Sequence, residues 1–557
     1  MKDLYIMGLC YSHDASACLL KNWIPLVAIQ KERITRKKHD GAIQNINLDD
    51  CIQYCFDAAG IELWDIELFV ENSPTILYCK EKDTILWFNK KRLLETIAKD
   101  KIIQISHHVA HAFAAYWSSP FQESAVLIID GQWNYYEDIT EDLSWAKIFP
   151  EYIESSYIER ESFYEFTGNN YTTLRKNLST IHKSFTKICG LGHMYETVSS
   201  YVFKSRHDAG KLMWLAPYGQ DVYDFKMINL LPSWEISYTT EWIRQFTTPN
   251  INGTLLETHW DQYRNLAYTT QSELENGITF LVKRLREQSK KENLCYSGWV
   301  SLNCSSNNLI KFDGWFKNLF ITPAASDAGI SLWCAYYGYL SLQKQPKKIY
   351  EYSDYLGKEY SDQEIEDALL SYKEQITYKK SENIYKEVAS LIAEGKIIGW
   401  FQWKSEFGPR ALWNRSIIAD PRNKNMPDIL NKQVKFREAF RPFAPSVMEE
   451  HADKFFDIDN SPYMLLTAQV QEEKKHIIPA VTHVDWTSRI QTVNAQQNPK
   501  YHKMIEAFYD LTGVPLVVNT SFNIINEPIV ETPKDAIRCF LGTGIDYLAI
   551  GEYIVRK

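Results

Sequence analysis

Basic side chains gather between residues 406 and 445, in a chain whose net charge is −9. The stretch reads EFGPRALWNRSIIADPRNKNMPDILNKQVKFREAFRPFAP. Arg410 follows Gly-Pro, Arg415 lies in Asn-Arg-Ser and Arg441 precedes Pro-Phe-Ala-Pro, so these guanidinium groups stand beside rigid turns and apolar residues. A charge run is more often a solvated face, but guanidinium groups held in place suit bidentate binding of phosphate or carboxylate. The stretch therefore predicts a site for a small anion.

A second group of residues with chemistry of their own lies in SHHVAHAFAAY. His107 and His111 are four apart on a predicted helix and therefore project from one face. A single histidine in such a run is more often a satisfied core or surface residue. Together with Asp130 at the end of the next strand and Asp327 in PAASDAG, the pair forms a set of two imidazoles and two carboxylates. Nitrogen and oxygen ligands without thiolate suit iron, manganese or zinc, so the set predicts a metal site.

The elements that must position these residues follow a repeated pattern. Segments 4–20 and 124–138 each read as a strand that ends in a polar turn. Actin-like and sugar-kinase-like folds present phosphate and metal ligands in this way, once in each duplicated half. Residues 343–395 are polar and charged before they become helical, which predicts a connector and the first helix of a second domain. Beyond it, KIIGWF, PLVVNTSF and DYLAIGEYIV alternate with helical segments such as 501–512, as expected of a second α/β domain.

Length and composition narrow the class of protein. With 557 residues, 45% of them hydrophobic, the chain can bury two large cores. Its acidic charge argues against nucleic acid or an anionic membrane as a partner. Ten cysteines lie scattered without a CxxC pair, which indicates reduced thiols and a cytoplasmic protein. We find no signal peptide and no apolar stretch near 18 residues, so we expect no membrane span.

The chain resembles a known family. GLCYSHDASACLL, SHHVAHAFAAYWSSPF, DAGKLMWLAPYG, PAASDAG, EFGPRALWNRSIIADPR, FREAFRPFAPSV, HVDWTSRIQTV and GVPLVVNTSFNIINEPIV are similar, in this order, to the O-carbamoyltransferases of nodulation-factor and antibiotic biosynthesis. The resemblance extends from about residue 4 to 553. It implies an actin-like, duplicated domain at 1–360, like the tRNA threonylcarbamoyl-transfer protein Kae1. It further implies an α/β domain at 361–557 like the carbamoyladenylate-forming protein YrdC.

The resemblance also implies a two-stage reaction. Carbamoyl phosphate and ATP, the latter with Mg²⁺, give carbamoyladenylate in the C-terminal domain. The carbamoyl group then passes to a hydroxyl of a small acceptor, such as a sugar, an antibiotic or another secondary metabolite, at the metal site of the N-terminal domain. The acceptor is not readable from the sequence, and a homodimer stays open.

The resemblance implies three sets of site residues, each assigned by its position in the matching motifs. His107, His111, Asp130 and Asp327 match the metal ligands, which hold Fe²⁺ in the family. His13 matches the histidine proposed as the base that deprotonates the acceptor. Residues that match contacts to carbamoyl phosphate and the nucleotide phosphates are Arg410, Lys435, Arg441, Arg489 and Ser521. To this binding set we add Arg415 from the basic stretch and Asn519 from the NTSFN run.

Tryptophan stands where the family usually has glycine. The positions are Trp133, Trp214, Trp299, Trp333, Trp403, Trp413 and Trp486. Glycine permits positive φ or a close backbone approach to phosphate, and indole permits neither. The chain has only 23 glycines, and UGA is read as glycine in some bacterial lineages but as tryptophan under another variant code. We hypothesise that several of these positions are glycine in the natural protein. The alternative is aromatic replacement in a degenerate paralogue.

Three functional hypotheses therefore compete. The first is an ATP-dependent O-carbamoyltransferase. The second is carbamoylation in hydrogenase maturation or threonylcarbamoylation of tRNA, which the acidic charge and the lack of CxxC pairs disfavour. The third is a non-catalytic nucleotide-binding or interaction protein, which genuine tryptophans in the ligand loops would favour.

Overall fold

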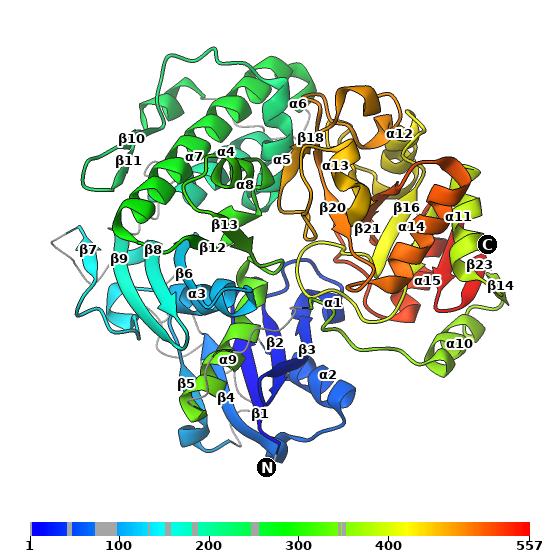
Figure 1. Cartoon of the computed structure of the whole chain (residues 1–557), viewed down its shortest axis with the longest axis horizontal. Helices are drawn as coiled ribbons and strands as arrows, with labels where there is room; N and C mark the ends of the chain where they lie inside the picture. Colours follow the sequence, from blue (N-terminus) through cyan, green and yellow to red (C-terminus); the bar gives the residue numbers. More distant parts are fainter. Residues whose placement is uncertain are drawn as a thin grey trace. The chain divides into compact units, whose positions relative to one another are not determined.

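The chain forms two compact units in a computed structural model (Figure 1). The structure describes residues 3–41, 47–72, 97–131, 134–150, 157–180, 188–246, 255–343, 347 and 353–557. The first unit takes in residues 1–26, 41–52 and 61–352, and the second takes in 27–40, 53–60 and 353–557. The chain thus passes finally into the second unit between Tyr352 and Ser353. Two short N-terminal segments belong to that unit as well, which a single cut at residue 360 does not represent.

The first unit contains two sheets with the same strand topology. One has the order β3-β2-β1-β4-β5, and the other has the order β13-β12-β6-β8-β9-β7. In each sheet the first strand in the chain pairs antiparallel with one neighbour and parallel with the other: β1 with β2 and β4, and β6 with β8 and β12. β1 thus corresponds to β6, β2 to β8, and β4 to β12, while β7 is an added edge strand. The predicted duplicated α/β fold is confirmed. The strands are β1 (Tyr5–Cys10), β2 (Ser16–Lys21), β3 (Ile24–Gln30), β4 (Ile66–Asn72), β5 (Ile102–Gln104), β6 (Glu123–Ile129), β7 (Lys147–Phe149), β8 (Tyr157–Thr167), β9 (Asn170–Thr180), β12 (Asn293–Ser297) and β13 (Asn318–Ile321).

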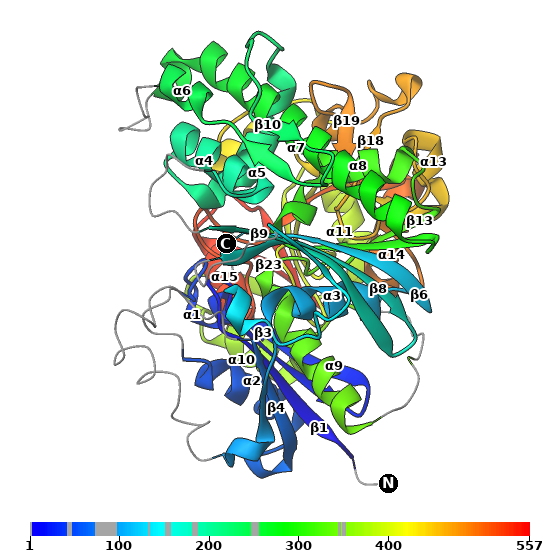
Figure 2. The same cartoon turned by 90° about the vertical axis from the view of Figure 1, so that its left-hand side faces the viewer.

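Two buried helices lie between these sheets. Helix α9 (Ile330–Leu342) contacts β1, β2 and β4, and α3 (His107–Ser118) contacts β6 and β12; the two helices also contact each other (Figure 2). Gly8 makes the first contact possible, because a Cβ there would lie 1.9 Å from the Ser331 carbonyl oxygen. The other helices of the unit are α4 (Leu191–Phe203), α5 (Ala209–Leu215), α6 (Leu255–Thr258), α7 (Trp260–Gln288) and α8 (Cys304–Phe312), and a small hairpin pairs β10 (Ile228–Leu230) with β11 (Ile236–Tyr238).

The second unit is built on one mixed sheet of eight strands. Their order is β14-β23-β22-β15-β16-β21-β17-β20, with a separate hairpin of β18 (Thr467–Gln469) and β19 (Thr487–Arg489). Its strands are β14 (Thr377–Lys380), β15 (Ile398–Phe401), β16 (Arg415–Ala419), β17 (Ala444–Met448), β20 (Gln491–Val493), β21 (Leu516–Ser521), β22 (Tyr547–Ile550) and β23 (Tyr553–Arg556). The runs predicted as strands become β15, β21 and the pair β22 and β23. They are confirmed.

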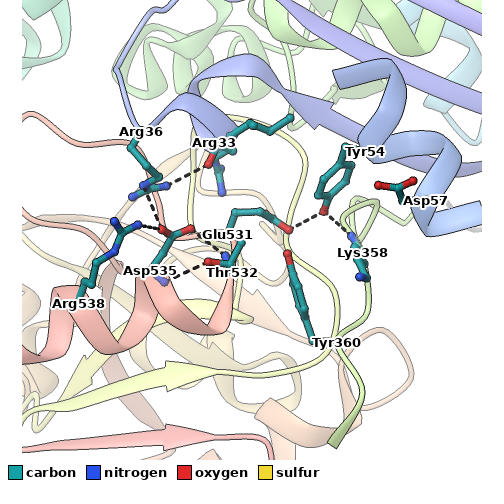
Figure 3. A pocket seen from close by; sticks show the side chains of 11 residues that line it. Arg33, Arg36, Tyr54, Asp57, Lys358, Tyr360, Glu531, Thr532, Asp535 and Arg538 are labelled. Atoms are coloured by element: carbon teal, nitrogen blue, oxygen red, sulfur yellow. Dashed lines mark hydrogen bonds and ion pairs between the residues drawn. The ribbon is translucent and has the colours of Figure 1, made fainter. Parts of the chain in front are cut away.

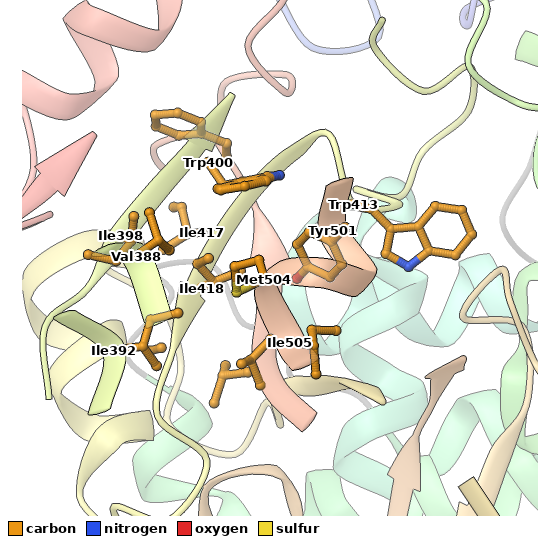
Figure 4. Packing of buried hydrophobic residues seen from close by; sticks show 14 of the residues in the cluster. Val388, Ile392, Ile398, Trp400, Trp413, Ile417, Ile418, Tyr501, Met504 and Ile505 are labelled. Atoms are coloured by element: carbon orange, nitrogen blue, oxygen red, sulfur yellow. The ribbon is translucent and has the colours of Figure 1, made fainter. Parts of the chain in front are cut away.

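Helices cover this sheet and close its apolar core. Its helices are α1 (Lys31–Thr35), α10 (Asp362–Leu370), α11 (Ile384–Ala393), α12 (Met426–Leu430), α13 (Ala452–Phe455), α14 (Pro499–Thr512) and α15 (Pro533–Leu541), while α2 (Asp49–Ala59) is divided between the two units. Helix α14 is the helix predicted at 501–512. Its Met504 and Ile505 pack with Ile418 of the sheet and Ile392 of α11 (Figure 4). Among the described residues, no helix is long and apolar enough to cross a bilayer.

Candidate functional site

The four predicted metal ligands converge in the first unit. His107 and His111 open α3, Asp130 follows β6, and Asp327 begins the turn that leads into α9. The His107 Nε2 atom lies 3.0 Å from Asp130 Oδ2 and 3.4 Å from Asp327 Oδ1, and His111 Nε2 also lies 3.0 Å from Asp130 Oδ2. All four side chains are buried, and their potential ligand atoms lie within 4.8 Å of one another. The structure therefore brings together the four residues that the spacing argument and the resemblance name, and their role as metal ligands stays a prediction.

Neighbouring polar groups orient both imidazoles. His107 Nδ1 lies 3.1 Å from Asn72 Oδ1, while the Asn72 amide donates to the Ile105 carbonyl at 2.9 Å. His111 Nδ1 lies 3.3 Å from Ser297 Oγ. A proton on each Nδ1 leaves the Nε2 lone pairs turned toward the carboxylates, as metal-binding histidines require. The sequence analysis missed Asn72 and Ser297, whose only signal is that each is the last residue of a strand parallel to the central one.

Neighbouring charges shift the pKa values of the ionisable groups in this cluster. Burial by itself lowers the His107 pKa, but the carboxylates of Asp327 and Asp130 outweigh it and raise the pKa to about 9. Burial likewise favours the neutral acid at Asp327, yet His107 brings its pKa down to about 2. Neither Asp327 oxygen has a hydrogen-bond partner among the described residues. The buried Asp327 carboxylate with its unpaired oxygens, beside the Asp130 carboxylate and two oriented imidazoles, fits a divalent cation.

His13 stands at the edge of the cluster. Its Nδ1 lies 3.5 Å from Asp327 Oδ2, and its side chain keeps about a fifth of its surface exposed, at 21%. The Trp299 ring stacks against the His13 ring at 5.4 Å between centroids, and the Trp299 backbone N–H donates to Asp130 Oδ1 at 3.0 Å. The structure thus brings the predicted base to the predicted metal ligands, with an indole beside it.

Glu196 of α4 is an acidic group that the sequence analysis did not single out. Burial raises its pKa to about 7; Arg206 and His13 lower the pKa, while Asp130 and Asp327 raise it. Helix α4 packs closely here, since a Cβ on Gly192 would lie 3.1 Å from the Asp130 carbonyl oxygen. A carboxyl group whose pKa lies near neutrality, and which interacts electrostatically with His13, is a candidate acid or base. The raised pKa of Glu196 depends on burial and on residues distant in the sequence, so no local sequence motif predicts it.

A buried ionic network supports the first turn of α3. Lys176 contacts both Glu141 and Glu159, and Glu141 in turn accepts a hydrogen bond from Ser106, the residue before the helix. The His107 backbone N–H donates to Asn134 Oδ1 at 2.6 Å. The Asn134 contact satisfies one of the N–H groups that a helix start leaves unpaired, and the ionic network beside it helps to fix the position of His107.

The predicted anion site lies in the second unit, where cations crowd one another. Burial lowers the Lys435 pKa well below its ordinary value, and Arg437 and Arg441 lower it further. Burial together with Arg441 and Arg489 lowers the pKa of Arg437 as well. Lys435 Nζ donates to Ser521 Oγ at 3.1 Å and to Asn523 Oδ1 at 2.6 Å. We call Lys435, Arg437, Arg441 and Arg489 the cationic cluster. Clustered cations of this kind gain most from a bound polyanion.

The other predicted binding residues have different surroundings. Arg415 is fully buried over the Phe401 ring, and its guanidinium donates to the carbonyls of Gln402 and Trp403 at 2.6 and 3.2 Å. Asn519 donates to Gln491 Oε1 at 2.6 Å inside the sheet. Arg415 and Asn519 therefore bond to other groups of the protein and stabilise the fold around the site. Arg410 is partly exposed. Arg437, counted in the basic stretch but not in the predicted binding set, belongs to the cationic cluster.

A separate cavity of about 350 Å³ lies near the start of α15 (Figure 3). None of the predicted site residues lines it. Its charges pair among themselves, because Asp535 contacts both Arg36 and Arg538, and Tyr54 donates to Glu531 at 2.6 Å. Arg36 also donates to the Pro528 carbonyl at 2.7 Å. Charges already paired in this way indicate a bracing role.

The fold and the clusters together define a two-unit α/β protein. Its first unit has a duplicated sheet topology and carries His107, His111, Asp130 and Asp327, which we call the His–Asp set; its second, mixed-sheet unit carries the cationic cluster. Two family models match it: "Carbamoyltransferase N-terminus" over residues 5–81 and 76–336, and "Carbamoyltransferase C-terminus" over 389–557. The chain therefore belongs to the carbamoyltransferase family, and it is an enzyme of that family.

Relatives agree with this placement. Nodulation protein NolNO of Sinorhizobium fredii is 31% identical over 98% of this chain and 79% of its own length. The 3'-hydroxymethylcephem-O-carbamoyltransferase of Amycolatopsis lactamdurans is 33% identical over 49% of this chain and 51% of its own. Among solved structures, T. kodakarensis HypF aligns over 61% of this chain and 48% of its own with 12% identity and a TM-score of 0.38.

Proposed function

We propose that this carbamoyltransferase is an ATP-dependent O-carbamoyltransferase acting on a small hydroxylated acceptor. The observation that carries the proposal is the convergence of His107, His111, Asp130 and Asp327, with His13 3.5 Å from Asp327. The relative from Amycolatopsis lactamdurans, a 3'-hydroxymethylcephem-O-carbamoyltransferase, supports a small-molecule hydroxyl as acceptor. The cationic cluster supports an activating step that handles phosphates.

Activation takes place at the cationic cluster in this proposal. Water and carbamoyl phosphate give carbamate and phosphate, and carbamate with ATP gives carbamoyladenylate and pyrophosphate. Lys435 and its neighbouring guanidinium groups compensate the phosphate charges, which repel one another until they are neutralised. Carbamate is unstable in water, so burial of Lys435 also serves to keep solvent away from it.

Transfer takes place beside the His–Asp set. His107, His111, Asp130 and Asp327 would hold a divalent metal, Fe²⁺ by the resemblance, which supplies polarisation of the carbamoyl oxygen or the acceptor hydroxyl. His13 accepts the proton of the acceptor hydroxyl as that oxygen bonds to the carbamoyl carbon. AMP then leaves with the electron pair of the broken C–O bond.

Two assays test the proposal on the complete protein. Pyrophosphate should appear when ATP and carbamoyl phosphate are both present, and radiolabelled carbamoyl should enter hydroxylated metabolites when these are added. Pyrophosphate that forms without carbamoyl phosphate, or labelled carbamoyl that never leaves the protein, would contradict it.

The alternative for a chain that carries tryptophan in the ligand loops is nucleotide binding without catalysis. The observation in its favour is that Trp403 and Trp413 lie in the loop between β15 and β16, next to Arg410 and Arg415, with both rings near Tyr355 at 5.2 and 5.7 Å. Indole side chains in that loop would occupy space next to the predicted phosphate-binding residues, which would hinder catalysis.

A further inference from the structure

Four tryptophans adopt a left-handed backbone. Their φ angles are 70° at Trp234, 41° at Trp403, 92° at Trp413 and 65° at Trp486. Only a few per cent of non-glycine residues have positive φ, and a bulky side chain there is an outlier. The chain holds 17 tryptophans, of which Trp87 and Trp133 lie outside the described residues. Within the described residues tryptophan supplies more positive-φ positions than asparagine, which tolerates this region far better.

Two of these tryptophans occupy the same position in two unrelated turns. In one turn, the Leu231 N–H donates to the Glu235 carbonyl at 2.9 Å and the Trp234 N–H donates to the Leu231 carbonyl at 3.0 Å. In the other, the N–H of His483 donates to the Thr487 carbonyl at 2.9 Å and that of Trp486 to the His483 carbonyl at 3.0 Å. This is the three-residue hairpin loop that closes on a left-handed residue, the position that glycine normally fills.

Trp413 combines three unfavourable features. Its φ of 92° lies beyond the usual left-handed range of a residue with a Cβ, its side chain is buried, and its Nε1–H has no hydrogen-bond partner among the described residues (Figure 4). Trp403, in the same loop, leaves an indole 37% exposed. The position of Trp403 thus buries only part of its indole, and the position of Trp413 imposes positive φ on a fully buried one.

We infer that the natural polypeptide carries glycine at 234, 403, 413 and 486. Trp234 lies outside the family motifs, so its backbone is an observation independent of the resemblance that pointed to the other three. The same criterion does not apply to Trp214 and Trp333, which lie within helices α5 and α9, nor to Trp299, which has no positive φ. Trp133 lies outside the described residues. UGA decoded as glycine accounts for one amino acid being replaced by one other at several sites. The inference does not depend on the proposed function.

The codons and the natural protein decide the matter directly. We expect UGA at all four positions and UGG at Trp242 and Trp400, whose φ angles are not positive and which are buried as ordinary core residues. Mass spectrometry of peptides from the protein made in its own cell should show glycine across 403 and 413. UGG codons, or tryptophan in those peptides, would overturn the inference.

Paired substitutions test the backbone argument without any activity assay. At 413 and 486 we expect Trp→Gly to unfold at a higher temperature than Trp→Ala, by about 2–4 °C at each site, because alanine keeps the Cβ that opposes positive φ. At Trp242, in a 3₁₀-helix and 3% exposed, the order should reverse. Equal midpoints for glycine and alanine at 413 and 486 would overturn the inference. Because the readout is thermal stability, failure of the proposed function leaves this result unaffected.

Discussion

At the scale of single residues, substitutions in the two clusters should impair different stages of the reaction. We expect Lys435→Ala and Arg441→Ala to lose formation of pyrophosphate by at least about 30-fold, because an uncompensated phosphate charge in a buried site costs about 2–5 kcal/mol. His107→Ala should keep pyrophosphate formation and lose transfer. The exposed Lys432, close in sequence to Lys435, provides a matched control as Lys432→Ala. If His107→Ala loses pyrophosphate formation as fully as Lys435→Ala, the assignment of stages to clusters is wrong.

Metal affinity should depend on the residues that orient the imidazoles. Asn72→Leu and Ser297→Ala each remove the partner of one Nδ1 atom, and we expect metal affinity to fall about 10- to 100-fold. Equilibrium dialysis with Fe²⁺ or Zn²⁺ measures the change. Asn318→Ala, an exposed change on β13, is the control. Unchanged affinity in both variants would show that the imidazoles are held by packing alone.

Glu196 should make stability depend on pH. Its folded-state pKa of about 7 lies above the ordinary 4.5, so the fold favours the neutral acid. The resulting stabilisation is complete below about pH 4.5 and is lost as pH rises through 7. Relative to Glu196→Gln, the unsubstituted chain should therefore become less stable in urea between pH 4.5 and 7, while the exposed change Glu257→Gln should give the same pH dependence as the unsubstituted chain. Parallel curves of stability against pH for the unsubstituted chain and Glu196→Gln would refute the assignment.

Some site residues were predictable from sequence and others were not, for physical reasons. His107 and His111 could be predicted as a pair because helical periodicity alone puts them on one face. Asn72 has no such local signal, since its role depends on which helix lies above the strand end. Arg415 shows the converse: its charge suggested anion binding, but sequence cannot tell a guanidinium aimed at a ligand from one aimed at backbone carbonyls.

At the scale of elements, the contact of α9 with β1 sets the position of Asp327. We expect Gly8→Ala to destabilise the protein and lower metal affinity, because its Cβ would meet the Ser331 carbonyl oxygen at 1.9 Å and the Ala335 nitrogen at 2.5 Å. Overpacking of this kind costs about 1–3 kcal/mol. Gly210→Ala in helix α5 meets no atom within 4 Å and should be neutral or stabilising. Urea unfolding of the two variants checks both expectations.

The elements themselves were largely predictable. The strand-and-turn repeat at 4–20 and 124–138 became β1 and β6, the central strands of two sheets with one topology. Short β-rich runs and a periodic helix likewise predicted β15, β21 and α14. The hairpin of β10 and β11 escaped notice, because its strands are short and its turn carries tryptophan where a turn signal would carry glycine.

At the scale of the whole molecule, the two compact units do not divide the chain at a single point. Sequence patterns locate the connector after residue 343, but they do not reveal that segments 27–40 and 53–60 belong to the second unit. Arg33 is buried there and donates to the Gly408 carbonyl at 2.8 Å, and Arg36 donates to the Ile529 carbonyl at 2.7 Å. Contacts between residues hundreds of positions apart produce no local sequence pattern from which they could be predicted.

This interrupted second unit has a consequence for how the chain acquires its structure during synthesis. Residues 27–40 leave the ribosome long before Gly408 and Ile529, so these segments wait unpaired through most of translation. A fragment of residues 353–557 would then lack part of its own unit. We expect that fragment to aggregate or unfold at lower urea concentration than the same unit within the complete chain, whereas adding a peptide of residues 27–60 should partly restore it. A fragment as stable as the intact unit would show that the early segments contribute little.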